Sequence, residues 1–253
     1  MKDPSSIPVV ILCGGKGTRL GDLAKSMPKP LVPIGGMPIL WHIMKGYAHQ
    51  GFKSFVLCLG YKGEMIEEFF TKGTLGGERA ATQAPREADW EIAFADTGLE
   101  TGTSGRVLKI KPHVAENERF FLTYGDGVSN VALGSLLEFH ERIGKLGTVT
   151  AVRPETSFGI IQEEAGVATA FAEKPRLNVL INGGFFVLEK KCFDYLDADG
   201  PLEERPLRRL TQERELAVYR HEGFWQCMDN QKELERLNVM WNQRERPWAL
   251  WEV

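Results

Sequence analysis

The chain has few cysteines, no long apolar run and no excess of charge of one sign. Its four cysteines (Cys13, Cys58, Cys192 and Cys227) form no CxxC pair and have no histidine at ligand spacing. Neither a disulfide framework nor a zinc site is therefore expected. The cysteines are expected to be free thiols in a reducing cytoplasm. The first apolar run, Val9–Cys13, is too short to span a membrane or to serve as a signal segment, so no membrane partner is expected.

Positive and negative charges nearly balance. The sequence has 31 Lys and Arg against 34 Asp and Glu, a net charge of −3. Proteins that bind nucleic acid usually carry a basic stripe, so no nucleic-acid partner is expected. With 253 residues, 43% hydrophobic and 26% charged, the composition is that of a globular chain. A chain of this length buries roughly 70–75% of its unfolded surface, which is enough for a core without a structural metal.

Short apolar runs alternate with helical periodicity through the first half of the chain. The runs that predict strands are Val9–Cys13, Ser54–Leu59, Arg119–Tyr124 and Gly147–Val152. Helical spacing between them begins after Pro38, near Met65 and at Val131. This alternation indicates βαβ units and an α/β fold with a mostly parallel sheet.

The second half has a less regular pattern. Phe158–Gln162 and Val167–Ala172 flank a turn at Gly166 and predict a hairpin. Asn182–Leu188 predicts a further strand, and Gln231–Gln243 predicts a helix. Lys72–Asp89 is rich in Gly, Ala and charge, and we interpret it as a loop without an assigned role.

A glycine-rich segment, Cys13–Leu20 (CGGKGTRL), directly follows the first predicted strand. Such a turn lets backbone N–H groups approach a phosphate, and the N-terminus of a following helix favours negative charge. It is not a P-loop, because Lys16 is followed by Gly17, and not a dinucleotide fingerprint, because position 20 is leucine. The glycines by themselves fit a tight turn with positive φ equally well.

A lysine between two prolines follows ten residues later. In Pro28–Ile34 (PKPLVPI) the prolines hold the backbone extended, so Lys29 is a flexible ammonium on a rigid support. A lysine in this setting is usually a solvated loop residue, but it also suits a phosphate. Together, GGKGTRL and PKPLVPIGG resemble the signature of the sugar-nucleotide pyrophosphorylases, nucleotidyltransferases that act on sugar 1-phosphates.

The resemblance extends along almost the whole chain. MPILWHIM, GYKG, TYGDG, EKP, INGGFFV and GFWQCMD occur in the family's order, and TYGDG, INGGFF and GFWQ…MD are most similar to the glucose-1-phosphate cytidylyltransferase branch. The resemblance implies a single Rossmann-like nucleotidyltransferase domain over residues 1–253, with a mixed, mostly parallel sheet. Its nucleotide-binding half would extend to about residue 130, and its sugar-binding, less regular C-terminal portion would begin at about residue 131.

The activity implied by the resemblance is formation of an NDP-sugar and pyrophosphate from a nucleoside triphosphate and a sugar 1-phosphate. CTP and glucose 1-phosphate are the favoured substrates, with CDP-glucose as the product and a cytoplasmic homo-oligomer as the enzyme. UTP or dTTP as donor, another sugar phosphate as acceptor, or a nucleotide-sensing subunit without catalysis are the alternatives.

Two aspartates are the candidate metal ligands. Asp126 lies in a Gly-Asp-Gly turn at the end of a strand, where it could simply cap its own backbone. Asp229 precedes a predicted helix, but Asn230 and Glu233 form a better capping pair and leave Asp229 for another task. The resemblance implies that Asp126 and Asp229 together hold Mg²⁺, a cation that prefers carboxylates, phosphate and water.

The resemblance also implies roles for other residues. Arg19 and Lys29 would neutralise the leaving pyrophosphate, and Lys174 would hold the sugar phosphate. The implied nucleotide-binding residues are Leu12, Gly14, Gly15, Gly17, Thr18, Thr103, Arg106 and Gly125. The implied sugar-binding residues are Tyr124, Glu173, Asn182, Gly183 and Trp225.

Several of these motifs also have purely structural interpretations. Glu173-Lys174-Pro175 is typical of a charged turn, and Asn182-Gly183-Gly184 fits a bulge as well as a sugar contact. Thr101–Arg106 fits a helix start capped by Thr103 or Ser104, and it also fits a segment in which Arg106 donates to O2 and N3 of cytosine.

A cluster of aromatic residues lies near the C-terminus. Phe224, Trp225, Trp241, Trp248 and Trp251 are expected in the core or at a subunit interface, with Trp225 the possible ligand contact. The tail from residue 248 to 253 is expected to be exposed, which would be compatible with a homo-oligomer.

Overall fold

The computed structural model describes residues 6–75, 78–79, 89–156 and 158–252. Most of the predicted loop at 72–89 therefore lies outside the described residues. Among those described, no helix is both long and apolar enough to cross a membrane.

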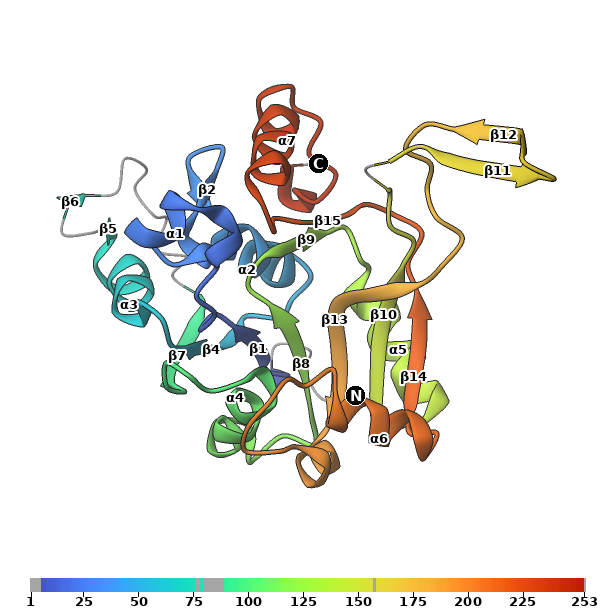
Figure 1. Cartoon of the computed structure of the whole chain (residues 1–253). Coiled ribbons are helices and arrows are strands. Elements are labelled where there is room, and N and C mark those ends of the chain that lie inside the picture. The colour runs from blue at the N-terminus through green and yellow to red at the C-terminus, as the bar shows by residue number, and fades with distance from the viewer. Residues whose placement is uncertain (1–5, 76–77, 80–88, 157, 253) are drawn as a thin grey trace.

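A seven-stranded sheet runs through the molecule in the order β14-β10-β13-β8-β1-β4-β7 (Figure 1). In chain order its strands are β1 (Val9–Leu12), β4 (Ser54–Leu59), β7 (Glu91–Asp96), β8 (Arg119–Tyr124), β10 (Gly147–Val152), β13 (Ile181–Glu189) and β14 (Leu216–Arg220). Only β13 is antiparallel to its neighbours β8 and β10, so the predicted α/β class with a mixed, mostly parallel sheet is confirmed.

Strand β1 lies at the centre of the fold because all four of its side chains are apolar and buried. Val9 and Ile11 join one hydrophobic cluster, and Val10 and Leu12 join the other on the opposite face of the sheet. The first cluster is covered by α2 (Ile39–His49), α3 (Gly63–Lys72), α5 (Leu133–Ile143) and α7 (Gln231–Asn242). The second is covered by α4 (Thr103–Lys109) and α6 (Arg205–Gln212).

Short elements make up the rest. The single turns and small helices are η2 (Thr18–Leu20), α1 (Asp22–Ser26), η3 (Lys29–Leu31), η4 (Lys111–Val114), η5 (Lys190–Tyr195) and η6 (Leu250–Glu252). Four small two-stranded sheets pair β2 (Pro33–Ile34) with β3 (Met37–Pro38), β5 (Thr74–Leu75) with β6 (Glu78–Arg79), β9 (Gly127–Ser129) with β15 (Trp225–Cys227), and β11 (Ile160–Glu164) with β12 (Val167–Ala172).

The predicted hairpin is the pair β11 and β12, which projects from the body of the molecule (Figure 1). The two strands of the large sheet that sequence patterning missed are its outer strands, β7 and β14. An edge strand is covered less completely than a central one, and charged residues at both ends of β7 hide its apolar centre.

The C-terminal tail folds back onto the body, so the expectation of an exposed tail was wrong. Trp248 is 1% exposed, and its ring stacks on Phe224 with 5.4 Å between centroids. Its indole N–H donates to Nδ1 of His42 at 3.4 Å. Burial lowers the pKa of His42 to about 4, so this histidine is neutral and can accept the bond. The aromatic residues therefore have the structural role that the sequence predicted for most of them.

A buried cation joins the carboxyl ends of β1, β4 and β7. Arg106, on α4, is 4% exposed, and burial lowers its pKa. Its Nη1 donates to the carbonyl of Leu59 at 2.9 Å and to the hydroxyl of Thr97 at 2.6 Å. Its Nη2 donates to the carbonyls of Gly14 at 3.1 Å and Leu99 at 3.2 Å. These acceptors lie at or shortly after the carboxyl ends of three neighbouring strands, so one side chain holds the ends of these strands and their loops together.

Replacing Gly14 by alanine is expected to destabilise the fold, whereas the same change at Gly15 is not. A Cβ at Gly14 would lie 2.0 Å from Nη1 of Arg106, but a Cβ at Gly15 would meet nothing within 4 Å. Displacing the guanidinium breaks buried hydrogen bonds, so Gly14→Ala should lower the free energy of unfolding by about 1–3 kcal/mol. Urea denaturation of both variants measures the difference. Equal stabilities would show that Arg106 moves aside freely.

Candidate functional site

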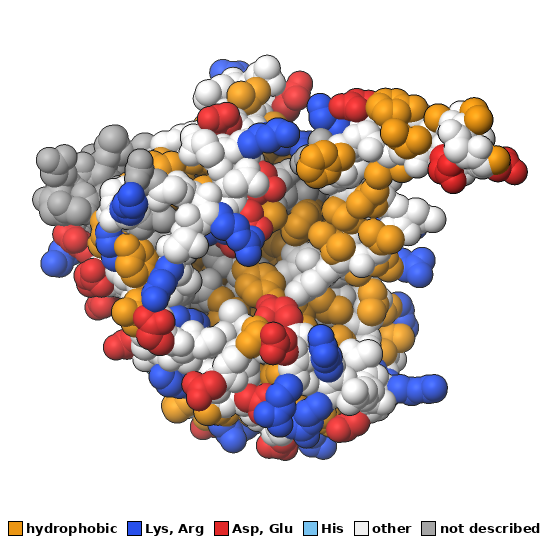
Figure 2. All heavy atoms as spheres, in the orientation of Figure 1, with side chains coloured by type: hydrophobic (Ala, Val, Ile, Leu, Met, Phe, Trp, Pro, Cys, Tyr) orange, Lys and Arg blue, Asp and Glu red, His pale blue; other side chains and the backbone are white. Residues whose placement is uncertain are grey.

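A cavity of about 390 Å³ opens at the carboxyl ends of β1 and β8, the edge at which open α/β sheets bind ligands. Figure 2 shows the hollow on this face, with basic and acidic side chains side by side at its margin. All predicted nucleotide-binding residues and both predicted metal ligands line it, together with Arg19, Lys29 and Tyr124. The structure therefore brings most of the predicted site together.

Lys29 lies between the two aspartates. Its Nζ is 2.6 Å from Oδ2 of Asp126 and 2.7 Å from Oδ1 of Asp229. Burial would lower the pKa of Lys29, but the two carboxylates outweigh burial and raise it. Burial likewise opposes ionisation of Asp229, but bonding to Lys29 and the charge of Arg19 lower its pKa. Lys29 and Asp229 are therefore both charged at neutral pH.

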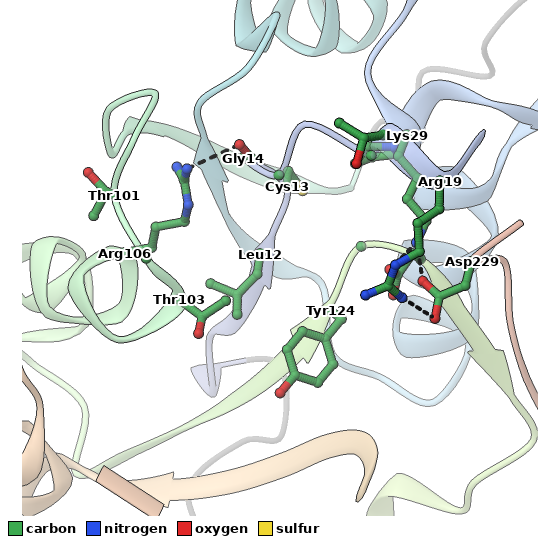
Figure 3. A pocket seen from close by; sticks show the side chains of 17 residues that line it. Leu12, Cys13, Gly14, Arg19, Lys29, Thr101, Thr103, Arg106, Tyr124 and Asp229 are labelled. Carbon is green, nitrogen blue, oxygen red and sulfur yellow. Dashed lines mark hydrogen bonds and ion pairs between the residues drawn. The ribbon is translucent and has the colours of Figure 1, made fainter. Parts of the chain in front are cut away.

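These contacts revise the role predicted for Lys29. The ammonium was expected to face a leaving pyrophosphate, but in this structure it bonds to the carboxylates expected to hold Mg²⁺. Arg19 approaches the same pair, with Nη1 at 3.3 Å from Oδ2 of Asp229 (Figure 3). Its side chain is 76% exposed, so Arg19 is the more accessible of the two cations.

The two aspartates fit a hard divalent cation. Both carboxylates bond to a single atom, Nζ of Lys29, so they converge on one point as Mg²⁺ ligands must. Ligand atoms of Cys227, Asp229 and Glu233 also lie within 4.8 Å of one another. A thiol is a poor ligand for Mg²⁺, however, and Glu233 already accepts hydrogen bonds from the backbone of Asp229 and Asn230. Of these three residues, only Asp229 suits the cation.

The start of α7 explains why Asp229 is available. The side chain of Asn230 accepts from the backbone N–H of Glu233, and Glu233 accepts from the N–H of Asn230. The capping box predicted from the sequence is therefore confirmed. Because Asn230 caps the helix, Asp229 can face the cavity.

The glycine-rich loop needs its glycines for different reasons. Of Gly14, Gly15 and Gly17, only Gly17 has a positive φ, 61°, so the alternative of a tight turn with positive φ at every glycine does not hold. A Cβ at Gly17 would also lie 2.9 Å from Cβ of Lys29. The loop leads into a three-residue 3-10 turn and the five-residue helix α1, not into a long helix. An anion here would depend on backbone N–H groups and Arg19 more than on a helix dipole.

The base-reading segment differs from its prediction. Thr103 does not cap α4, whose N-cap is Gly102 without a side-chain cap; its hydroxyl instead accepts from the N–H of Leu202 at 2.7 Å. The terminal nitrogens of Arg106 already donate four hydrogen bonds to the protein. The picture of Arg106 as a free donor for a base is therefore wrong in this structure. Arg106 lines the cavity and holds the backbone of Gly14 (Figure 3).

Tyr124 and Asn182 form a linked pair on β8 and β13. Nδ2 of Asn182 donates to Oη of Tyr124 at 3.2 Å, and its Oδ1 accepts from the N–H of Gly184 at 2.8 Å. Gly184 has φ 80°, and a Cβ there would lie 2.6 Å from the Tyr124 ring. The pairing of β10 with β13 shifts register here, as the bulge interpretation predicted. Gly184 thus makes room for a tyrosine.

Four of the predicted sugar-binding residues do not line the first cavity, and neither does Lys174. Lys174 and Trp225 line a second cavity of about 610 Å³ beside the hairpin, and the Trp225 indole donates to the carbonyl of Gly183 at 2.7 Å. Glu173 forms an exposed ion pair with Lys174 at 3.3 Å. Glu173, Asn182 and Gly183 line neither cavity. The structure therefore does not bring Lys174 to Lys29, and its sugar-phosphate role stays a prediction.

Sequence reasoning missed one residue that contacts the site. Glu203 lies in the charged segment Pro201–Arg205, which contains no recognisable motif. Its carboxylate accepts from the hydroxyls of both Tyr124 and Thr103. No local pattern could have found this, because the two partners are 79 and 100 residues away.

Known proteins resemble this chain over nearly its whole length. A protein named "Glucose-1-phosphate cytidylyltransferase" from Salmonella typhi is 40% identical over 96% of this chain and 99% of its own length. "Probable glucose-1-phosphate cytidylyltransferase" of Bacillus subtilis is 46% identical over the same shares. Among solved structures, HddC from Yersinia pseudotuberculosis complexed with GMP-PN (20% identity, TM-score 0.72) covers 93% of this chain and 99% of its own.

A second solved structure, UDP-glucose pyrophosphorylase complexed with UDP-glucose, has 15% identity and a TM-score of 0.72 over 94% of this chain and 99% of its own. At such identities both structures support the Rossmann-like α/β fold alone. The model of the family described as nucleotidyl transferase matches residues 8–242. The chain therefore belongs to the nucleotidyl transferase family.

Proposed function

We propose that this protein makes CDP-glucose and pyrophosphate from CTP and glucose 1-phosphate. The observation that carries the chemistry is the single cavity in which Lys29, Arg19, Asp126 and Asp229 face the glycine-rich loop. The choice of CTP and glucose is supported by the names of the relatives that are 40% and 46% identical.

In this reaction an oxygen of the sugar phosphate attacks the α-phosphorus of the nucleotide. The new P–O bond forms as the bond to the bridging oxygen of the β-phosphate breaks, and pyrophosphate leaves with that electron pair. No covalent enzyme intermediate is needed, so the protein contributes positioning and charge stabilisation. Backbone N–H groups of Gly14, Gly15 and Gly17 would cradle the phosphates, and the exposed guanidinium of Arg19 would bind the leaving pyrophosphate.

The aspartate pair would hold Mg²⁺, which as a Lewis acid polarises phosphoryl oxygens when bound. Lys29 bonds to both carboxylates, so its ammonium group and the Mg²⁺ ion would share this pair of carboxylates. Lys29 keeps these carboxylates together, and its charge adds to the positive field at the phosphates.

Base choice, assembly and location are parts of the same proposal. Arg106 is fully engaged, and the hydroxyl of Thr103 is bonded to Leu202 and Glu203. Thr101 is therefore the cavity-lining side chain best suited to read the base. We propose a homo-oligomer of cytoplasmic chains, each with one nucleotidyltransferase domain. The family resemblance supports this, as do the exposed apolar residues on the hairpin, such as Phe171, which is 66% exposed.

The substrate proposal is tested by pyrophosphate release with Mg²⁺ and glucose 1-phosphate, offering CTP, UTP, dTTP, ATP and GTP separately. Strong release with CTP alone is expected. Release with another nucleotide would reject the cytidylyl assignment but keep the chemistry. If other sugar phosphates also gave none while nucleotide still bound, the protein would be a nucleotide-sensing subunit.

Replacing Lys29 by alanine is expected to lower kcat by about 10²–10³-fold, because one preorganised charge at the reacting phosphates is lost. The matched control is Lys53→Ala, which removes an exposed lysine paired with Asp89 outside the cavity and should leave kcat unchanged. Steady-state kinetics of purified variants decides the matter. A Lys29→Ala enzyme with near-normal turnover would refute the assigned role.

Removal of divalent cations with EDTA is expected to stop turnover, and Mg²⁺ to restore it. Asp126→Asn should then need more Mg²⁺ for half-maximal activity, because an amide is a weaker ligand than a carboxylate. Activity is measured as a function of free Mg²⁺ for both proteins. An unchanged midpoint in the variant would mean that Asp126 is not a ligand.

A further inference from the structure

The hydroxyls of Tyr124 and Thr103, two residues that line the nucleotide cavity, both donate to the carboxylate of Glu203. Glu203 itself does not line the cavity. Tyr124, at the end of β8, donates its phenolic hydrogen to Oε1 of Glu203. Thr103, at the start of α4, donates to Oε2 at 3.2 Å. Glu203 is therefore the point at which a strand end and a helix start, both facing the cavity, are joined.

The backbone before Glu203 is docked tightly, although its side chain is exposed. Leu202 is 1% exposed, and its N–H donates to the hydroxyl of Thr103 at 2.7 Å. The N–H of Ser104 donates to the carbonyl of Gly200 at 3.2 Å. A Cβ at Gly102 would lie 2.2 Å from that carbonyl, so the two segments approach as closely as glycine permits. The position of Glu203 is therefore set by the fold.

A chain of hydrogen bonds leads from Glu203 through Tyr124 to Asn182. The amide of Asn182 donates to Oη of Tyr124 at 3.2 Å, and the tyrosine passes its own hydrogen to Glu203. Burial and the charge of Glu203 raise the pKa of Tyr124, so its hydroxyl stays protonated and keeps donating. Each member of the chain thus has a fixed donor or acceptor role.

The negative charge of Glu203 also determines which substrate groups can lie near it. The phosphate end of the cavity has Lys29 and Arg19, whereas Thr103 lies at the opposite side (Figure 3). The ring of Tyr124 lies between the two, with its hydroxyl turned away from the cations. A carboxylate disfavours phosphate but accepts hydrogen bonds from hydroxyl groups, and it has about four acceptor positions, of which two are used here. This side therefore suits the neutral, hydroxyl-bearing part of a substrate.

We propose that Glu203 is a positioning residue that orients Tyr124, and through it the ring of the sugar 1-phosphate. This inference rests on the proposed function, since it assigns Tyr124 and Asn182 to the acceptor sugar. A positioning residue of this kind affects binding of the sugar more than binding of the nucleotide, whereas a residue that only stabilises the fold would not separate the two.

The test compares Glu203→Ala and Glu203→Gln with the wild-type enzyme in steady-state kinetics. Loss of hydrogen bonds to a charged group should raise KM for glucose 1-phosphate by about 10-fold or more. KM for the nucleotide should change little. Glu203→Gln keeps the shape of the side chain and one acceptor oxygen, so its KM for glucose 1-phosphate should lie between those of the wild type and Glu203→Ala. The matched control is Glu204→Ala, the next residue, which is exposed and makes no side-chain cap bond to α6.

A double-mutant cycle with Tyr124→Phe shows whether Glu203 acts through Tyr124. In the Tyr124→Phe background, Glu203→Ala should have little further effect on KM for the sugar phosphate. Additive effects, or a Glu203→Ala enzyme that matches the Glu204→Ala control, would overturn the inference. If Glu203→Ala does not fold, the same criteria apply to Glu203→Gln.

The wild-type result separates this inference from the proposed function. A wild-type enzyme that uses another nucleotide or sugar phosphate would reject the CDP-glucose assignment, and Glu203 is then judged on KM for that sugar phosphate. A wild-type protein silent with every pair would overturn both. Normal wild-type activity with an unaffected Glu203→Ala variant would overturn the inference on Glu203 alone.

Discussion

Two carboxylates can face each other in a partly buried cavity only if a cation lies between them, and much of this structure supports that arrangement. Lys29 bonds to Asp126 at 2.6 Å and to Asp229 at 2.7 Å. Without a cation, repulsion between the carboxylates would raise the pKa of one of them or separate them. The three residues come from distant parts of the chain, so their meeting requires the sheet, the proline-rich turn and the start of α7 together.

Each of the three is held by a different local device. Pro28 and Pro30 restrict the backbone on either side of Lys29. Asp126 lies in the turn after β8, at the carboxyl edge of the sheet. Asp229 precedes α7 and is released from capping because Asn230 and Glu233 form the capping box. The charged groups thus need little reorganisation to meet, which is what charge stabilisation of a phosphoryl transfer requires.

A second cation, Arg106, bonds to the backbone beside the first. Arg106 lies behind the glycine-rich loop and donates to the carbonyls of Gly14 and Leu59. Its guanidinium occupies the space that a Cβ at Gly14 or Gly60 would need, at 2.0 and 2.5 Å. The buried arginine therefore explains why positions 14 and 60 are glycine. On another side of the cavity, Glu203 accepts hydrogen bonds from the hydroxyls of Tyr124 and Thr103.

The sequence by itself determined the α/β class, the central strands, the capping of α7 and most of the residues around the first cavity. These follow from local signals: an unbroken apolar run at Val9–Leu12, a capping pair at Asn230 and Glu233, and motifs that keep their order along the chain. Only the tertiary structure decided which partners the polar groups have. Arg106 bonds to carbonyls up to 92 residues away, and Glu203 bonds to Thr103 across 100 residues. Charge and hydrogen-bonding capacity are properties of a residue, but their partners depend on which segments the fold brings within about 3 Å.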